Sequence, residues 1–110
     1  MIQDTIGKIE AQLQKADAVR NGNKAELLQL LAMLKSEVAD LARTDAEQAQ
    51  SIAGFTAVST HEATREERNP ELVKLSLKGL SSSVEGFEQT HPKLVQSVNA
   101  IATALSNLGI

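Results

Sequence analysis

The apolar residues of the last stretch of the chain repeat at helical spacing, and this pattern restricts the fold most. The repeat follows a 4-3-4-3 spacing through Leu94, Val98, Ile101, Leu105 and Leu108. That spacing keeps all five on one narrow stripe of a helix, which needs a partner helix along its length. Pro92 suits the first turn and Gly109 suits a left-handed C-terminal cap.

The same spacing recurs upstream and predicts an all-α protein. Helices are expected over residues 2–18, 24–59, 70–88 and 92–108. The expected stripes are Ile2, Ile6, Ile9 and Leu13; Leu27, Leu31, Leu34, Val38 and Leu41; and Val73, Leu77, Leu80, Val84 and Phe87. Aromatic residues make up only 2% of the chain, so the core must consist of Leu, Ile, Val and Ala, as in helical bundles. We expect residues 1–110 to form one domain, an antiparallel bundle of about four helices.

Local signals mark the helix boundaries. Residues 21–23, Asn-Gly-Asn, are expected to connect the first two helices, and Asn23 with Glu26 has the form of a capping box. Asn69 is the expected cap of the third helix, with Pro70 at its first position. Thr90 or His91 is expected to cap the fourth.

Two interpretations of the second helix remain open. It either continues to about Ser59 or breaks, with Thr44-Asp-Ala-Glu47 as a new capping box. Continuity places Asp45 on the apolar stripe, which is unfavourable, but no Pro or Gly lies near position 44. We expect continuity, which makes this helix about 54 Å long. Residues 61–68 are highly charged without an apolar stripe and are expected to form a solvated helix end or loop.

The last two helices are expected to form an antiparallel hairpin with unusually neutral outer faces. No charged residue follows Lys93, and one flank of the third helix is apolar or small. Glycine inside a helix costs about 1 kcal/mol relative to Ala, so two glycines on that flank either mark close approach of another backbone or are simply tolerated there. The candidate interface residues on these faces are Leu72, Leu75, Gly79, Ser83, Gly86, Ser97, Ala100 and Ala104.

The hairpin also carries a family resemblance. Phe87-Glu-Gln-Thr-His-Pro-Lys-Leu94, followed by the ending Ala104-Leu-Ser-Asn-Leu-Gly-Ile110, resembles the C-terminal signature of a small bacterial family, the domain of unknown function 4404. The resemblance is strong over residues 70–110 and diffuse over the two earlier helices. It implies a small, soluble, all-helical bacterial protein and supplies no catalytic residues.

Motifs for metal or catalytic chemistry are incomplete. His61-Glu-Ala-Thr-Arg65 begins like a zinc-protease helix, but Arg65 occupies the second ligand position and cannot bind zinc. Glu88 and His91 have the Glu-x-x-His spacing of di-iron bundles, which require two such pairs and two further glutamates. We expect His61 to lie on the surface, and His91 to cap or pack at a helix end over Pro92. No catalytic, cofactor or metal site is expected, and we do not expect an enzyme.

Charge and cysteine content narrow the possible partners. The formal net charge is −3 with no run of Lys or Arg, which argues against nucleic-acid binding. The chain has no Cys, no signal-peptide pattern and no apolar run of about 18 residues, so we expect a cytoplasmic protein that does not span a membrane.

The leading hypothesis is an interaction module with coiled-coil-like packing that forms a homodimer through its neutral faces. The alternatives are a peripheral membrane or lipid-associated protein, in which Ile101, Leu105 and Leu108 face the lipid, and a bundle that binds a small ligand or metal.

Overall fold

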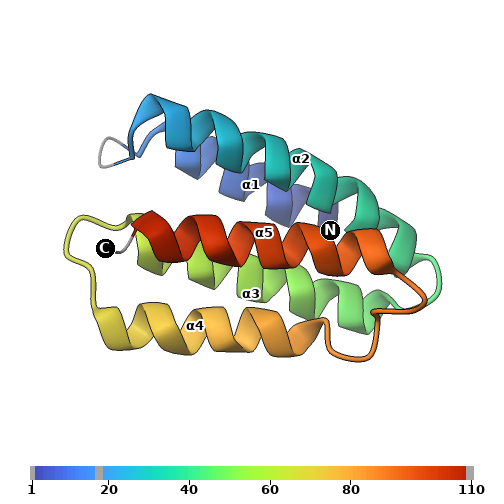
Figure 1. Ribbon diagram of the computed structural model, residues 1–110. Coiled ribbons are helices and arrows are strands. Elements are labelled where there is room, and N and C mark those ends of the chain that lie inside the picture. The colour runs from blue at the N-terminus through green and yellow to red at the C-terminus, as the bar shows by residue number, and fades with distance from the viewer. Residues whose placement is uncertain (1, 17–18, 109–110) are drawn as a thin grey trace.

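Five antiparallel helices make up the part of the chain that the computed structural model describes, residues 2–16 and 19–108. They are α1 (Ile2–Gln14), α2 (Asn21–Ala42), α3 (Ala46–Thr64), α4 (Pro70–Ser83) and α5 (Pro92–Leu108). Successive helices run in alternating directions, and no strand occurs within the described ranges (Figure 1). The all-helical class is therefore confirmed, but the number of helices is five rather than four. Gly109 and the side chain of Ile2 lie outside the described residues.

The extra helix arises because the predicted 24–59 helix breaks at residues 43–45. Thr44 and Asp45 both donate their backbone N–H to the carbonyl of Leu41, which ends α2. Asp45 then caps α3, its carboxylate accepting the N–H of Gln48 at 3.1 Å. A continuous helix would have placed this carboxylate on the apolar stripe, whereas the break places it in solvent. The expectation of one long helix was wrong, and the cap is Asp45 rather than Thr44.

The helix released by this break, α3, lies at the centre of the bundle. It contacts all four other helices, and in Figure 1 it lies between α4 and the α1–α2 pair. Most of its buried residues are small: Ala49, Ile52, Ala53, Thr56, Ser59, Thr60, Ala63 and Thr64. Small side chains let several helices approach one axis closely. They also leave no leucine stripe for sequence analysis to find.

Three buried threonines of α3 meet their own hydrogen-bonding needs. Thr56, Thr60 and Thr64 donate their hydroxyls to the carbonyls four residues earlier, at 2.7, 2.8 and 2.6 Å. A buried hydroxyl is costly only when it lacks a partner, so threonine is tolerated here as a small core residue. Residues 61–68 were predicted to be a solvated helix end or loop. Residues 65–68 are exposed and follow the helix, but α3 continues to Thr64, and Ala63 and Thr64 are buried.

The connection between α1 and α2 also differs from the prediction. Residues 21–23 form the first turn of α2, which begins at Asn21 after Arg20, so Asn23 does not cap it. Instead, the Lys24 ammonium donates to the carbonyl of Gln14 at 3.1 Å, satisfying one of the free carbonyls at the end of α1. Helix α1 ends there, earlier than the expected residue 18.

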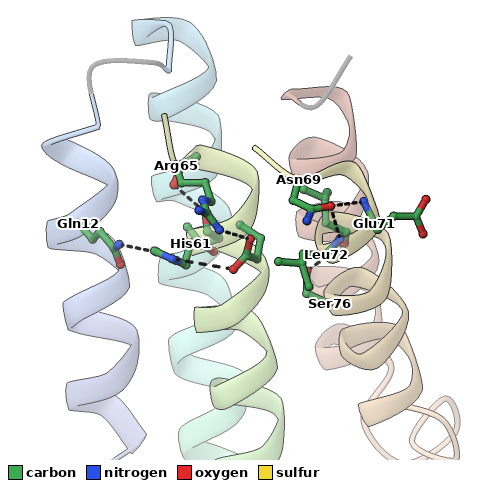
Figure 2. Close-up of polar contacts among 11 residues, drawn as sticks. Gln12, His61, Arg65, Asn69, Glu71, Leu72 and Ser76 are labelled. Carbon is green, nitrogen blue, oxygen red and sulfur yellow. Dashed lines mark hydrogen bonds and ion pairs between the residues drawn. The ribbon is translucent and has the colours of Figure 1, made fainter. Parts of the chain in front are cut away.

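The starts of α4 and α5 agree with the sequence. Asn69 accepts the N–H groups of Glu71 and Leu72 at 3.0 and 3.4 Å, and Pro70 opens α4 (Figure 2). Pro92 is the first residue of α5. The predicted stripes fill the core: the large apolar residues without exposed surface include Leu31, Leu34, Leu80, Leu94 and Ile101.

Helix α4 ends five residues before its predicted end at 88. Val84 is its C-cap, and Gly86 adopts a φ of 94° in the turn that follows, a left-handed conformation that disfavours any residue with a Cβ. Gly86 is therefore a turn residue and not part of a helical glycine face. Its N–H is bound by the Glu88 carboxylate at 2.9 Å.

Replacing the cap of α3 should weaken the fold. Asp45→Ala removes the acceptor for the Gln48 N–H and should lower the free energy of unfolding by about 1 kcal/mol. Urea unfolding followed by circular dichroism measures this change. Gln50→Ala, at an exposed position of the same helix, is the control and should change stability by less than about 0.5 kcal/mol. Equal effects of both substitutions would show that Asp45 does not act as a cap.

Two glycine substitutions should have opposite effects on stability. A Cβ at Gly54, an exposed position inside α3, meets no atom within 4 Å, so Gly54→Ala should stabilise the protein by about 0.5–1 kcal/mol through helix propensity. Gly86 has equal space but a positive φ, so Gly86→Ala should destabilise it by about 1–2 kcal/mol. Thermal unfolding of both variants at one protein concentration tests the contrast, and a shift of the same sign in both would contradict it.

Candidate interaction surface

Exposed apolar side chains gather on two neighbouring helices. Phe55 and Val58 of α3 are 41% and 50% exposed, and Leu72 and Leu75 of α4 are 40% and 67% exposed. We call these four residues the α3–α4 patch. Among the described residues one other large apolar side chain is exposed to this degree, Met33 on α2 at 52%. A gathered group of this kind is more informative than a single exposed residue, because contiguous apolar surface marks interaction sites.

Contacts between the two helices set the relative positions of the patch residues. Ser59 donates its hydroxyl to the carbonyl of Ser76 at 3.0 Å, which fixes the antiparallel register of α3 and α4. In that register the Phe55 ring lies directly over Gly79, where an added Cβ would overlap it. The close approach expected at this glycine is therefore real, but the neighbour is an aromatic ring and not a backbone. Phe55 spans the boundary between the two helices.

Helix α4 packs on the bundle through two serines as well as through Val73 and Leu80, whereas Leu72 and Leu75 stay outside. Ser76 and Ser83 are buried, and their hydroxyls bond to the carbonyls of Val73 and Leu80 within α4. Gln48 of α3 adds a bond from its amide to the Ser83 carbonyl at 2.6 Å. Within the described chain α4 contacts only α3 and α5. Its outer side is consequently open.

The structure separates the interface residues predicted from sequence. Leu72 and Leu75 lie exposed in the patch, and Gly79 lies beneath Phe55. Ser83 and Ser97 are buried inside the single chain, which makes them unavailable to a partner.

The other predicted residues lie away from the patch or only partly exposed. Gly86 is exposed in the turn after α4, and Ala100 is half-buried on α5. Ala104 lines a small hollow with Asn23 and Leu27, which places it on the α2 side of α5. The neutral faces of α4 and α5 therefore do not form one surface.

Two patch residues escaped sequence analysis. Ile52 and Thr56 of the same helix are buried, whereas Phe55 and Val58 point outward, and the sequence of α3 has no leucine stripe that separates the two sides. A large apolar pair three residues apart, in a helix of otherwise small residues, was the available signal.

A second feature is a polar group around His61 at the ends of α1 and α3. Gln12 and His61 approach at 3.5 Å, and the other His61 nitrogen lies 3.9 Å from the Glu62 carboxylate (Figure 2). Arg65 donates to the same carboxylate at 3.1 Å. The group borders an open cavity of about 330 Å³ that Lys15 also lines. His61 is on the surface, as predicted.

The nearby helix ends explain why basic side chains lie beside this cavity. Helices α1 and α3 end at Gln14 and Thr64, beside the cavity, and a helix C-terminus carries partial negative charge. Lys15 and Arg65 lie where cations offset that charge, so the cavity gives little reason to expect a bound anion. Within the described residues no three His, Asp or Glu side chains are grouped so that they could hold a metal ion.

The motif of the hairpin that carries the family resemblance forms the turn between α4 and α5. The His91 N–H bonds to the Phe87 carbonyl at 2.8 Å, and their rings pack edge to face with centroids 5.7 Å apart. His91 also contacts the Thr90 hydroxyl at 3.1 Å, and Phe87 packs against the core. These residues shape the connection into α5, so the motif has a structural explanation.

Comparison with protein families identifies the chain's relatives. A family model described as domain of unknown function (DUF4404) matches residues 27–110. The chain belongs to the DUF4404 family. The match includes α2 and α3, and thus extends beyond the region of strong resemblance expected from the hairpin. In this DUF4404 member the terminal part of the signature is held by Arg68, whose guanidinium donates to the Leu108 carbonyl at the end of α5.

Other comparisons add no further relative. Searches of curated proteins and of solved structures gave no match. None of the described helices has the length and apolar character that a membrane span requires.

Two serine substitutions test which buried hydroxyls matter. Ser97 Oγ is buried without a hydrogen-bond partner among the described residues, so Ser97→Ala should leave stability unchanged or raise it. Ser59→Ala removes the bond to Ser76 and should cost about 0.5–1.5 kcal/mol. Chemical unfolding of the two variants at one concentration gives the comparison. If Ser97→Ala proves the more damaging, the internal placement of its hydroxyl is wrong.

Proposed function

We propose that this DUF4404 protein is a non-enzymatic interaction module that forms a homodimer through its α3–α4 patch. The observation that carries the proposal is the gathering of Phe55, Val58, Leu72 and Leu75 on one exposed face. The hydrophobic effect favours covering such a face, and the described part of the chain leaves it open. Two-fold dimers are the commonest way in which small proteins bury a surface of their own.

The position of α4 supports this assignment. The inner face of this edge helix is already packed against the bundle by Val73, Ser76, Leu80 and Ser83, so the leucines on its outer side contribute little to the fold of the single chain. Leu75 is the most exposed large apolar residue described, and it lies at the middle of α4. Energetic anchors of interfaces cluster at the centre of the contact, where water is excluded. Leu75 is therefore the residue whose loss should affect association most.

A lipid-associated role has less support. Of the three residues that suggested it, Ile101 and Leu105 are buried in the core and Leu108 is partly buried against it. The patch itself borders two cations, Lys74 and Lys78, but the net charge of −3 opposes binding to an anionic surface. Co-flotation with vesicles that contain anionic lipid separates the two roles, because a dimer that covers the patch should not float.

A charge placed in the patch should abolish association without unfolding the chain. Leu75→Glu should weaken dimerisation by roughly 100-fold or more, because it removes an apolar contact and adds a charge at the centre of the interface. Sedimentation equilibrium from micromolar to high micromolar protein measures the change. Circular dichroism should show unchanged helicity.

Met33→Glu is the matched control, since Met33 has similar size and exposure but lies on α2, away from the patch. It should retain the dimer. A wild-type protein that has monomer mass across the whole range would refute the proposal. Equal weakening by both substitutions would remove the patch from it.

A further inference from the structure

We propose that the partner on the α3–α4 patch is a second copy arranged so that α4 packs antiparallel against α4 of the partner, about a two-fold axis at the level of Leu75. This inference rests on the proposed self-association and specifies its geometry. It depends on where charges lie beside the patch and on the register between α3 and α4.

The first argument is that one axis serves both helices of the patch. The Ser59–Ser76 hydrogen bond places these residues at one level along the bundle. Their neighbours Val58 and Leu75 therefore lie at nearly the same level, one on each helix. A two-fold axis through that level brings both residues close to their symmetry copies. The two most exposed apolar residues of the patch then meet at the centre of one interface.

The second argument is the charge pattern beside Leu75. Glu71 lies four residues before Leu75 and Lys78 three residues after it, so all three share one side of α4. Both charged residues are exposed, and neither forms an ion pair with another described residue. Each helix thus presents an acidic group on one side of the leucine and a basic group on the other.

An antiparallel arrangement pairs these charges. If Leu75 faces Leu75 of the second copy, Glu71 of each chain lies level with Lys78 of the other, to within about one residue or 1.5 Å along the axis. Two opposite-charge pairs result, one on each side of the axis. A parallel arrangement would instead set Glu71 against Glu71 and Lys78 against Lys78. Like charges across an interface oppose association, so the pattern selects the antiparallel form.

The same axis places apolar surface opposite the rest of the patch. Leu72 of one copy lies level with residue 78 or 79 of the other, beside the Phe55 ring that covers Gly79. The ring offers a flat apolar surface where a larger residue at 79 would displace it. The patch is therefore complementary to itself, as an interface between identical subunits requires.

Reversing charges on the full-length chain tests this geometry. The dissociation constants of wild type, Glu71→Lys, Lys78→Glu and the double variant are measured by sedimentation equilibrium at low ionic strength. Each single substitution turns two attractive pairs into two repulsive ones and should weaken the dimer by about tenfold or more. The double variant should recover to within about threefold of wild type, and the differences should shrink at 1 M salt.

Mixing the two single variants gives an independent measure. Chains with Glu71→Lys carry two cations beside Leu75, whereas chains with Lys78→Glu carry two anions. Neither should dimerise well alone, but together they should form a heterodimer with two attractive pairs. Weaker association of the mixture than of either single variant would overturn the inference.

The double variant Glu71→Lys/Lys74→Glu is the matched control. It has the same net charge and composition as the double swap, but Lys74 lies one residue from Leu75 and points about 100° away around the helix. It should not recover. The loss of Glu71 from the first turn weakens α4 equally in both doubles, so recovery in only one cannot come from monomer stability.

The outcomes separate the two proposals. A monomeric wild type refutes self-association and this geometry with it. A wild-type dimer that Leu75→Glu disrupts, but whose dissociation constant is unchanged by all charge swaps, supports the interaction module and refutes the antiparallel α4 pairing. Weakening by both single swaps, with recovery only in the Glu71→Lys/Lys78→Glu double, supports both.

Discussion

The bundle depends on the close packing of α3 against its four neighbours. A helix in this position needs side chains small enough for other helices to approach on several sides, and α3 supplies Ala49, Ala53 and Ala63 together with hydroxyl residues. The hydroxyls do not incur the usual cost of burial, because each threonine bonds to a carbonyl of its own helix. The larger side chains of the surrounding helices then supply most of the apolar volume of the core.

The sequence predicts the outer helices, which carry the large apolar residues, better than the central helix, whose buried residues are small. The outer helices carry leucine, isoleucine and valine at 4-3 spacing, and their stripes proved to be core in nearly every case. The cap at Asn69 and the helix start at Pro70 depend on local chemistry and could be predicted from the sequence equally well. The central helix has no such stripe, since its buried surface is Ala, Ser and Thr. The sequence therefore predicts that α2 and α3 form one helix. In that prediction Asp45 is an unfavourable residue on the apolar stripe, whereas in the structure its carboxylate caps α3.

The candidate surface was predictable only in part, for a related reason. The exposure of Leu72 and Leu75 could be predicted because both lie on a flank of α4 outside its apolar stripe. Ser83 and Ser97 were predicted on the neutral outer faces of the last two helices because small polar residues resemble surface residues in a sequence, but both are buried. In this bundle they are packing residues, placed where helices come close. Phe55 and Val58 belong to α3, whose buried side could not be recognised from the sequence. Their exposure therefore could not be predicted.

The packing of α4 shows what this arrangement costs and permits. Its inner face is serine-rich and its docking relies on hydrogen bonds such as those of Ser59 and Gln48, so its larger apolar residues are partly free for other contacts. Glu71 and Lys78 flank Leu75, so one end of this exposed side is acidic and the other is basic. The fold thus leaves large apolar side chains exposed on a helix at the edge of the bundle, which contacts only α3 and α5 among the described helices.

The small-residue character of α3 has a consequence for how the family can diverge. Exchange between alanine and serine along its buried positions keeps the volume nearly constant, whereas threonine is larger and brings its own hydrogen bond. Growth to leucine or phenylalanine would force neighbouring helices apart, because a packed interior does not absorb extra methylene groups cheaply. We therefore expect substitutions along this helix to be limited mainly by side-chain volume and hardly by polarity. On the leucine-bearing helices around it, we expect polarity to be the stricter limit.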